Sequence, residues 1–176
     1  MNLSHIKIGK DFPKSINAII EIPRGSNNKY EYRQDIDAIV LDRVLHSPFF
    51  YPADYGFIPQ TLSQDGDTLD VLVLIKQPTF PGCILKARPV GAIDMEDEKG
   101  KDYKIIAVAE NDPYYNQVYN LDQVNIHLRE EIRHFFQAYK ELEKGKSTIF
   151  KGWLSKEEAY AVIEREHKLF LSEKNI

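Results

Sequence analysis

The chain is nearly free of cysteine, and this scarcity excludes one class of protein at the outset. Its single thiol, Cys83, cannot close an internal disulfide, so the 176-residue chain is not a small scaffold held together by disulfides. Cys83 lies in the apolar stretch Cys83-Ile84-Leu85, with no basic partner evident beside it. We therefore expect this cysteine to pack in the core and not to act as a nucleophile.

Long apolar runs and an excess of positive charge are also missing. No stretch approaches the ~20 apolar residues that a membrane span requires, and residues 1–20 contain no uninterrupted apolar segment. The formal net charge of −4 argues against nucleic acid or an anionic membrane as the main partner. We expect a cytoplasmic protein with no nucleic-acid partner and no membrane partner.

The most informative feature present is the group of carboxylates in Asp65-Gly66-Asp67-Thr68-Leu69-Asp70. Ionised side chains this close repel one another, and hard divalent cations, which prefer oxygen ligands, relieve the repulsion. The apolar run Val71–Ile75 that follows predicts a buried strand. The acids would then lie where a turn enters a rigid strand, which suits a metal-assisted reaction. A solvated acidic turn is the alternative interpretation.

Two further features favour phosphoryl chemistry over a solvated turn. A second acidic cluster, which includes Asp97 and Asp102, lies between residues 94 and 102. Cationic and phenolic side chains occur upstream in Lys29-Tyr30-Glu31, Asp42-Arg43 and the segment 51–56. Acids that bind metal, together with cations and phenols that bind an anion, are the components of metal-assisted phosphoryl transfer.

The order of predicted elements is strand-rich first and helical last. Alternating and continuous apolar runs predict strands over residues 18–22, 30–33, 38–45, 69–75, 84–93 and 104–109. A helical period predicts a helix over 124–143, with Tyr139 and Leu142 on its apolar face and Gly145 as its stop. Ser155 and Glu158 form a capping box that opens a last helix. This order fits an α+β fold with a mainly β core, in which a small closed barrel is flanked by two C-terminal helices.

Three other motifs resemble known sites but lack required parts. An EF-hand that begins at Asp65 would need a glycine at position 70 and a glutamate at position 76, where the chain has Asp70 and Lys76. A P-loop that ends in Gly145-Lys146-Ser147 would need a glycine at position 140, where the chain has Lys140. Two Glu-x-x-His pairs, one in each predicted helix, would need a four-helix bundle to form a di-iron centre. We set all three aside.

A series of short motifs runs along the chain in a fixed order. They are Glu21-Ile22-Pro23, Lys29-Tyr30-Glu31, Asp42-Arg43, Tyr51-Pro52, Tyr55-Gly56, Asp65–Val71, Arg88-Pro89-Val90-Gly91, Asp97-Glu98, Asp102-Tyr103-Lys104, His134-Phe135-Phe136, Tyr139-Lys140 and Glu143-Lys144-Gly145. This ordered set of motifs resembles the soluble family I inorganic pyrophosphatases.

The resemblance runs from Gly9 to Trp153, which is nearly the whole chain, and one position departs from it: Thr68 stands where the family's signature usually has proline or glutamate. Threonine keeps every carboxylate of the signature but lacks the fixed φ angle of proline.

The resemblance implies a fold and an activity. It implies that residues 1–176 form a single inorganic pyrophosphatase domain built on an OB-like five-stranded β-barrel. It implies hydrolysis of inorganic pyrophosphate to two orthophosphates by Mg²⁺-assisted attack of a metal-bridged hydroxide, with several Mg²⁺ ions in each active site. Chain length and the C-terminal pattern resemble the compact bacterial members, which assemble as homohexamers. A non-catalytic OB-like module that binds phosphate or a nucleotide is the alternative.

The same resemblance implies roles for individual residues. The metal ligands would be Asp65, Asp70, Asp97 and Asp102. Lys29, Arg43, Tyr55, Lys104, Tyr139 and Lys140 would bind the substrate, and Tyr55 would also assist catalysis.

Three of the implied roles have alternatives in the residues themselves. Asp67 would be the catalytic base that takes a proton from the attacking water; otherwise it is a further metal ligand or a turn-capping acid. Glu21 and Glu31 would support Lys29 or metal-bound waters; otherwise they form surface salt bridges. Tyr139 continues an apolar helical face and is otherwise a core residue.

Overall fold

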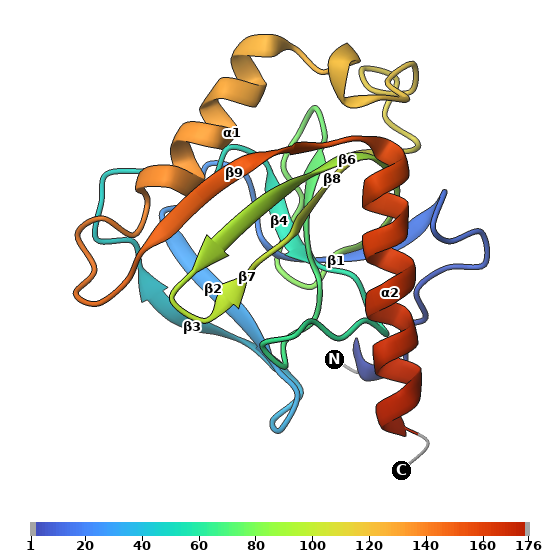
Figure 1. Ribbon diagram of the computed structural model, residues 1–176, viewed down its shortest axis with the longest axis horizontal. Coiled ribbons are helices and arrows are strands. Elements are labelled where there is room, and N and C mark those ends of the chain that lie inside the picture. Colours follow the sequence, from blue (N-terminus) through green and yellow to red (C-terminus); the bar gives the residue numbers. More distant parts are fainter. Residues whose placement is uncertain (1–2, 175–176) are drawn as a thin grey trace.

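Five strands close into a ring at the centre of the molecule. In the computed structural model, which describes residues 3–174, these strands pair in the order β1–β4–β5–β8–β6, and β6 pairs back with β1 (Figure 1). The strands are β1 Ile16–Ile22, β2 Asn28–Arg33, β3 Ala38–Val44, β4 Asp54–Phe57, β5 Asp70–Leu74, β6 Ile84–Asp97, β7 Gly100–Lys101, β8 Lys104–Ala109 and β9 Thr148–Leu154. The helices are α1 Ile126–Ala138 and α2 Lys156–Lys174, and short 3₁₀ helices cover Leu3–His5 and Leu121–Gln123.

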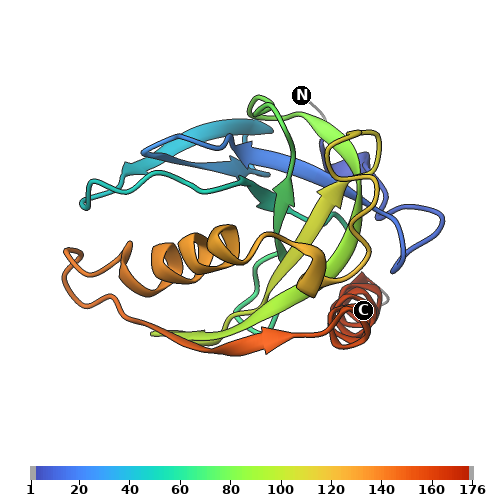
Figure 2. The ribbon, with the colours of Figure 1, turned by 90° about the horizontal axis from the view of Figure 1, so that it is seen from above.

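Within the ring, only β5 and β8 are parallel neighbours. The strands β7 and β9 pair with β6 outside the ring, and β2 and β3 form a separate two-stranded sheet. Figure 2 shows α1 between the β2–β3 sheet and β9. The closed five-stranded barrel with two C-terminal helices confirms the predicted α+β, OB-like fold.

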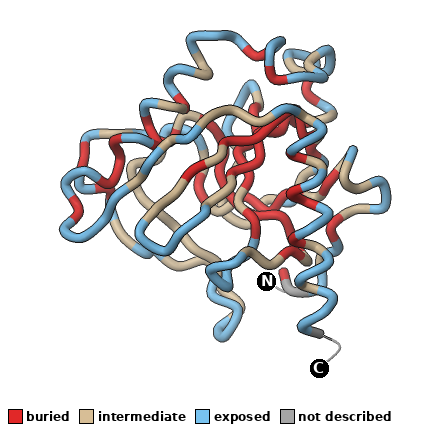
Figure 3. The backbone as a smooth tube through the Cα atoms, viewed as in Figure 1, coloured by how far each residue is buried: buried red, intermediate tan, exposed pale blue. Residues whose placement is uncertain are grey.

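The core surrounds the ring strands on both faces. Every residue of β8 and all but the first of β5 are buried, and alternate side chains enter two apolar clusters. One cluster includes Phe135 and Phe136 of α1, and the other includes Val162 and Ile163 of α2. Buried segments accordingly concentrate at the centre of the molecule (Figure 3). The prediction of a buried strand after Asp70 is confirmed, and Cys83 packs half-buried against the α2 cluster.

The strand β4 was not predicted, because it is only four residues long and contains a glycine. Gly56 pairs with Ile20 of β1, and a Cβ atom added to it would lie 1.9 Å from the backbone oxygen of Ile19. Only glycine permits this approach of the two strands. The close pairing fixes β4, and with it the position of the neighbouring Tyr55.

The predicted helix over 124–143 is too long. α1 ends at Ala138, Leu142 is 64% exposed, and Gly145 lies in a later turn at φ +73°. After α1 the backbone makes three-residue turns, in which the Glu143 N–H donates to the carbonyl of Lys140 at 2.9 Å. These turns stand where the prediction continued the helix. The Leu142 side chain therefore does not lie on the apolar face of α1.

The start of the last helix was predicted correctly. Ser155 Oγ accepts from the Glu158 N–H at 3.3 Å, while the Glu158 carboxylate accepts from the Ser155 N–H at 2.7 Å. The strand β9 was missed, because Lys151 and Gly152 interrupt its apolar pattern. Among residues 3–174, no helix combines the length and the apolar character that crossing a membrane requires.

Candidate active site

A polar cavity of about 500 Å³ gathers residues from both sheets, the loops between ring strands and the end of α1. Every site residue predicted from the sequence lines it. They are Glu21, Lys29, Glu31, Arg43, Tyr55, Asp65, Asp67, Asp70, Asp97, Asp102, Lys104, Tyr139 and Lys140. Side chains that are spread over some 120 positions of the sequence therefore face one space.

The floor of the cavity is built around the Lys104 ammonium. The strands β5 and β8 are parallel neighbours, and Asp70 of β5 is paired with Lys104 of β8. The two side chains therefore leave the sheet from neighbouring positions. Lys104 Nζ donates to Asp70 Oδ2 at 2.8 Å, to Asp102 Oδ1 at 2.9 Å and to Tyr55 Oη at 3.2 Å. The Tyr55 hydroxyl in turn donates to Asp70 Oδ2. We call Tyr55, Asp70, Asp102 and Lys104 the floor cluster.

The floor cluster combines burial with strong mutual attraction. Burial lowers the pKa of Lys104, but Asp70, Tyr55 and Asp102 outweigh it and raise that pKa well above its usual value. Burial and the neighbouring Asp70 raise the pKa of Asp102, against the opposing effect of Lys104. The Lys104 side chain is only 3% exposed and stays charged because two carboxylates surround it.

The loop between β4 and β5 presents the other two carboxylates of the signature. Gly66 adopts φ +88°, a conformation that strains other residues, and it reverses the chain between Asp65 and Asp67. The Ser63 N–H donates to the Asp67 carbonyl at 2.7 Å, and the Asp67 N–H donates to Asp65 Oδ1 at 3.1 Å. The Asp67 side chain is 70% exposed, and Lys99 Nζ lies 3.3 Å from its carboxylate. We call residues 61–69 the acidic loop.

The β2–β3 sheet supplies one cationic wall. Lys29 is in register with Arg43 across the two strands. Lys29 Nζ contacts Glu31 and lies 3.2 Å from Asp42 Oδ2, and Arg43 donates to Asp42 at 2.6 Å and to Glu143 at 3.0 Å. The two cations lie at the cavity surface, where each is balanced by carboxylates.

The turns after α1 supply a second cationic wall. Lys140 Nζ lies 3.2 Å from Asp97 Oδ2, and Lys146 Nζ lies 2.6 Å from Glu98 Oε1. Tyr139, the residue that follows the helix, is buried among aromatic rings yet borders the cavity. Burial raises its pKa above the usual value, so its hydroxyl remains protonated.

Glu21 differs from the other acids of the cavity. It accepts a hydrogen bond from the Tyr32 N–H at 2.7 Å. Burial raises its pKa to about 8, although that hydrogen bond opposes the rise, and the nearby Asp70 adds to it. At neutral pH this carboxyl is therefore largely protonated, which lowers the negative charge beside the floor cluster.

Sequence reasoning assigned no role to several residues that line the cavity. Asp42 and Glu98 stood inside quoted motifs, so their types were visible but their partners were not. Arg165 and Glu166 come from α2, about a hundred positions after the acidic loop, and no sequence signal connected them to it. The cavity residues missed as site residues include Asp42, Glu98, Lys99, Lys101, Tyr103, Lys146, Arg165 and Glu166.

The donor set of the cavity suits hard divalent cations. Among residues 3–174 no three acids, imidazoles or thiols are grouped closely enough to hold one ion as the side chains stand. Instead, Lys104, Lys99 and Lys140 each place an ammonium against one or two of the aspartates. The carboxylates therefore already attract cations, and their oxygen atoms are ligands that Mg²⁺ prefers. The residues present fit such ions.

Comparisons with known proteins agree with this geometry. A family model described as inorganic pyrophosphatase matches residues 18–171. An inorganic pyrophosphatase of Methanosarcina mazei is 47% identical over 90% of this chain and 93% of its own length. One of Nostoc sp. is 46% identical over 97% of this chain and 99% of its own length.

Solved structures give the same result. The inorganic pyrophosphatase of Thermus thermophilus superposes with a TM-score of 0.94 at 44% identity, over 97% of this chain and 99% of that one. The enzyme of Helicobacter pylori superposes with a TM-score of 0.91 at 40% identity, over 95% and 99% of the two chains. With the fold, the ordered motifs and the relatives in agreement, the chain belongs to the inorganic pyrophosphatase family.

Proposed function

We propose that this chain is an inorganic diphosphatase that hydrolyses inorganic pyrophosphate to two orthophosphates. The observation that carries the proposal is the division of one cavity into a group of aspartates and two walls of lysine and arginine. Pyrophosphate is small and highly charged, so it needs cations for binding and charge neutralisation for attack. A family match over residues 18–171 supports the same activity.

We assign substrate binding to the cationic walls. Lys29 and Arg43 on one side, and Lys140 on the other, would exchange part of their present carboxylate contacts for phosphate oxygens. The protonated hydroxyls of Tyr55 and Tyr139 would donate hydrogen bonds to phosphate oxygens. Lys104 lies deeper and would neutralise charge at the floor.

We assign proton transfer to Asp67. Attack of a water on one phosphorus forms a new P–O bond and breaks the bridging P–O bond, and the water must lose a proton. The Asp67 carboxylate is exposed at the cavity and belongs to no strand, so it can reach a water near the substrate. Divalent cations bound to Asp65, Asp70, Asp97 and Asp102 would neutralise the substrate's charge and acidify the attacking water.

We further propose Mg²⁺ as the cation and a homohexamer as the assembly. The carboxylate donor set supports Mg²⁺. Large apolar side chains at the surface, including Leu41, Phe50 and Ile126, support contact between copies. The treatment of residues 1–176 as one domain and a cytoplasmic location remain predictions from the sequence.

A non-catalytic phosphate-binding module is not favoured by the family match, and one assay separates it from the enzyme. We expect phosphate release from pyrophosphate with Mg²⁺ and its loss when EDTA removes the metal. Binding of pyrophosphate without release of phosphate, measured with the same protein at saturating Mg²⁺, would contradict the proposed activity. If the protein does hydrolyse pyrophosphate, the double variant Lys29→Met/Arg43→Met should have a higher KM for this substrate.

A further inference from the structure

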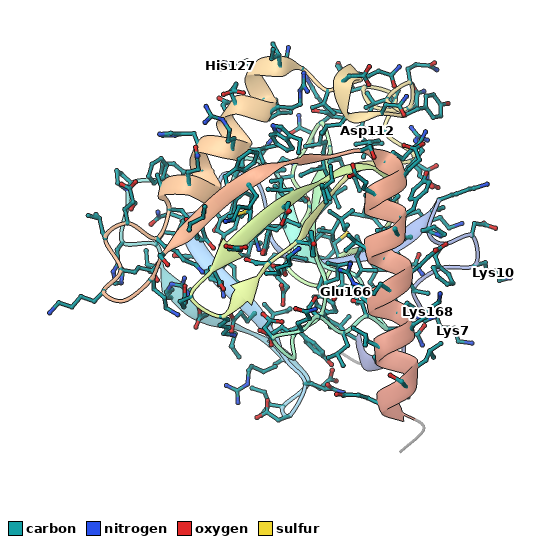
Figure 4. All side chains as sticks on the ribbon, in the orientation of Figure 1. Lys7, Lys10, Asp112, His127, Glu166 and Lys168 are labelled. Carbon is teal, nitrogen blue, oxygen red and sulfur yellow. The ribbon has the colours of Figure 1, made fainter. Side chains whose placement is uncertain are left out.

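One turn of α2, residues 165–167, contacts both chain segments that carry the predicted metal-binding acids. His167 Nδ1 donates to the backbone carbonyl of Gln60 at 2.7 Å, just before the acidic loop. The Leu62 N–H, inside that loop, donates to the backbone carbonyl of Glu166 at 3.0 Å. Figure 4 shows Glu166 on the side of α2 that faces the sheet. The helix therefore holds the start of the acidic loop at two points, Gln60 just before the loop and Leu62 within it.

The backbone at Gln60 is held in an unfavourable conformation. Its φ is +59°, a value that residues other than glycine rarely adopt. Such a conformation persists only where neighbouring contacts over-determine it. Gln60 has two of these contacts, since its carbonyl accepts from His167 and its side-chain oxygen accepts from the Ile8 N–H at 3.1 Å.

The opposite end of the acidic loop is secured from within the barrel. The Thr61 hydroxyl donates to the Ile58 carbonyl at 2.6 Å and accepts from the Leu69 N–H at 2.9 Å. These bonds close the neck of the loop but do not reach its outer part. The outer part, which carries Asp65 and Asp67, has its own hydrogen bonds, such as that from the Ser63 N–H to the Asp67 carbonyl. Its link to α2 runs through the contacts of Gln60 and Leu62.

The same turn also contacts the segment that carries Asp102. The Arg165 guanidinium lies over the ring of Tyr103, 5.1 Å from its centroid, and donates to Glu166 Oε1 at 2.8 Å. Tyr103 stands between Asp102 and Lys104 in the chain. Arg165 contacts the Asp102 segment, while Glu166 and His167 contact the acidic loop and Gln60 before it, so consecutive residues of one helix reach both acidic segments.

We propose that residues 165–167 form a positioning element that fixes the acidic loop relative to the Asp102 segment. In this role His167 is a positioning residue for the proposed pyrophosphate hydrolysis, on which the inference rests. His167 does not line the cavity; it acts through the backbone of Gln60. A loop released from the helix would sample more conformations, so the pre-organised arrangement of its carboxylates would be lost.

Two substitutions at one position separate the hydrogen bond from the packing. His167→Phe keeps an aromatic ring against Phe12 and Phe170 but cannot donate to Gln60. His167→Asn loses the ring but places an amide nitrogen close to the position of Nδ1. Lys168→Gln, an exposed change on the same helix, is the matched control (Figure 4).

The readouts are Mg²⁺ affinity by calorimetry, amide hydrogen exchange of residues 61–68 in metal-free protein, and the kcat and Mg²⁺ dependence of pyrophosphate hydrolysis. For His167→Phe we expect Mg²⁺ affinity roughly 3–10-fold weaker, the range for one lost hydrogen bond, and faster exchange in residues 61–68. We expect kcat at saturating Mg²⁺ to stay within about twofold of the parent. His167→Asn and Lys168→Gln should match the parent in all three.

Two results would overturn the inference. One is His167→Phe with parental Mg²⁺ affinity and parental exchange in residues 61–68, even if its melting temperature falls. The other is His167→Asn losing Mg²⁺ affinity and gaining exchange as much as His167→Phe does, because a hydrogen-bond donor restored at this position would then not hold the loop. If the parent protein fails to hydrolyse pyrophosphate, the proposed function fails, while calorimetry and exchange still decide whether His167 positions the loop.

Discussion

The aspartates of the cavity are held in two different ways. Asp70 and Asp102 in the floor cluster contact a lysine that is 3% exposed, and registered strands determine their positions. Asp65 and Asp67 in the acidic loop depend on a glycine turn, and the lysine that approaches Asp67 is 54% exposed. Aspartate thus occurs both in a mostly buried setting, with side chains 29% and 19% exposed at Asp70 and Asp102, and in a largely exposed one, with 70% at Asp67.

This difference separates two kinds of chemical work. Charges in the floor cluster are screened little by solvent, so they bind cations strongly and change position little. A carboxylate in contact with solvent can take up and release protons readily, which a general base requires. We therefore expect substitution of Asp67 to fail in a different way from substitutions in the floor cluster.

The largest effect on rate is expected at Asp67. Asp67→Asn removes a proton acceptor but keeps the side chain's shape, so kcat at saturating Mg²⁺ should fall by roughly 10²–10⁴-fold. The loss should ease as pH rises, because hydroxide can replace the missing base. The melting temperature should stay near that of the parent, since the side chain is 70% exposed. A rate within threefold of the parent across the pH range would exclude Asp67 as the base.

The largest effect on stability is expected at Lys104. Lys104→Met leaves Asp70 and Asp102 facing each other without their shared cation, which should cost about 3–5 kcal/mol of unfolding free energy in metal-free buffer. Added Mg²⁺ should recover part of this loss and stabilise the variant more than the parent. Lys99→Met is the matched control at the acidic loop and should change stability by no more than about 0.5 kcal/mol. Equal losses in urea unfolding for both variants would remove the distinction between the two regions.

The pH dependence of stability should report on Glu21. Its folded pKa of about 8 lies above the ordinary glutamate pKa of 4.5, so the folded state keeps a proton that the unfolded state loses. This contribution to stability is complete below pH 4.5 and is lost as pH rises to 8. Glu21→Gln cannot ionise, so in metal-free buffer it should be more stable than the parent at pH 8 and similar to it at pH 4. Parallel stability curves between pH 4 and 8 would contradict the raised pKa.

The smallest effect is expected far from both regions, at the start of α2. Ser155→Ala removes one side of the capping box and should cost about 1 kcal/mol. Turnover and Mg²⁺ dependence should be unchanged, because Ser155 does not line the cavity. Thermal unfolding and a standard assay check both statements. A drop in turnover beyond twofold would show that stability loss alone disturbs the site.

The parts predicted from the sequence are those that depend on local pattern. The acidic signature and the apolar run after Asp70 lie together in the chain, so their junction was visible without a fold. The contact of Lys104 with Asp70 depends on parallel register between β5 and β8, which no local pattern encodes. For the same reason Glu166 and His167 were missed as partners of the acidic loop and of Gln60 before it.

Errors in the predicted elements also have local causes. The end of α1 was placed five residues too late, because Tyr139 and Leu142 continue its apolar period while the backbone turns at Lys140. β4 escaped prediction because Gly56 weakens the strand pattern of the sequence. The close pairing of β4 with β1 nevertheless requires glycine at this position. At β4 tertiary contact, and not propensity, decides the backbone.

The most direct test of Asp67 as the base, and of Asp65 and Asp70 as metal ligands, is a Mg²⁺ titration of turnover for Asp65→Asn, Asp67→Asn and Asp70→Asn, measured at several pH values. We expect raised Mg²⁺ to recover part of the rate lost in Asp65→Asn and Asp70→Asn, because those variants bind the cation more weakly. Asp67→Asn should show near-parental Mg²⁺ dependence and no recovery. Recovery of Asp67→Asn to the same extent as Asp65→Asn would show that Asp67 is a metal ligand and contradict its assignment as the base.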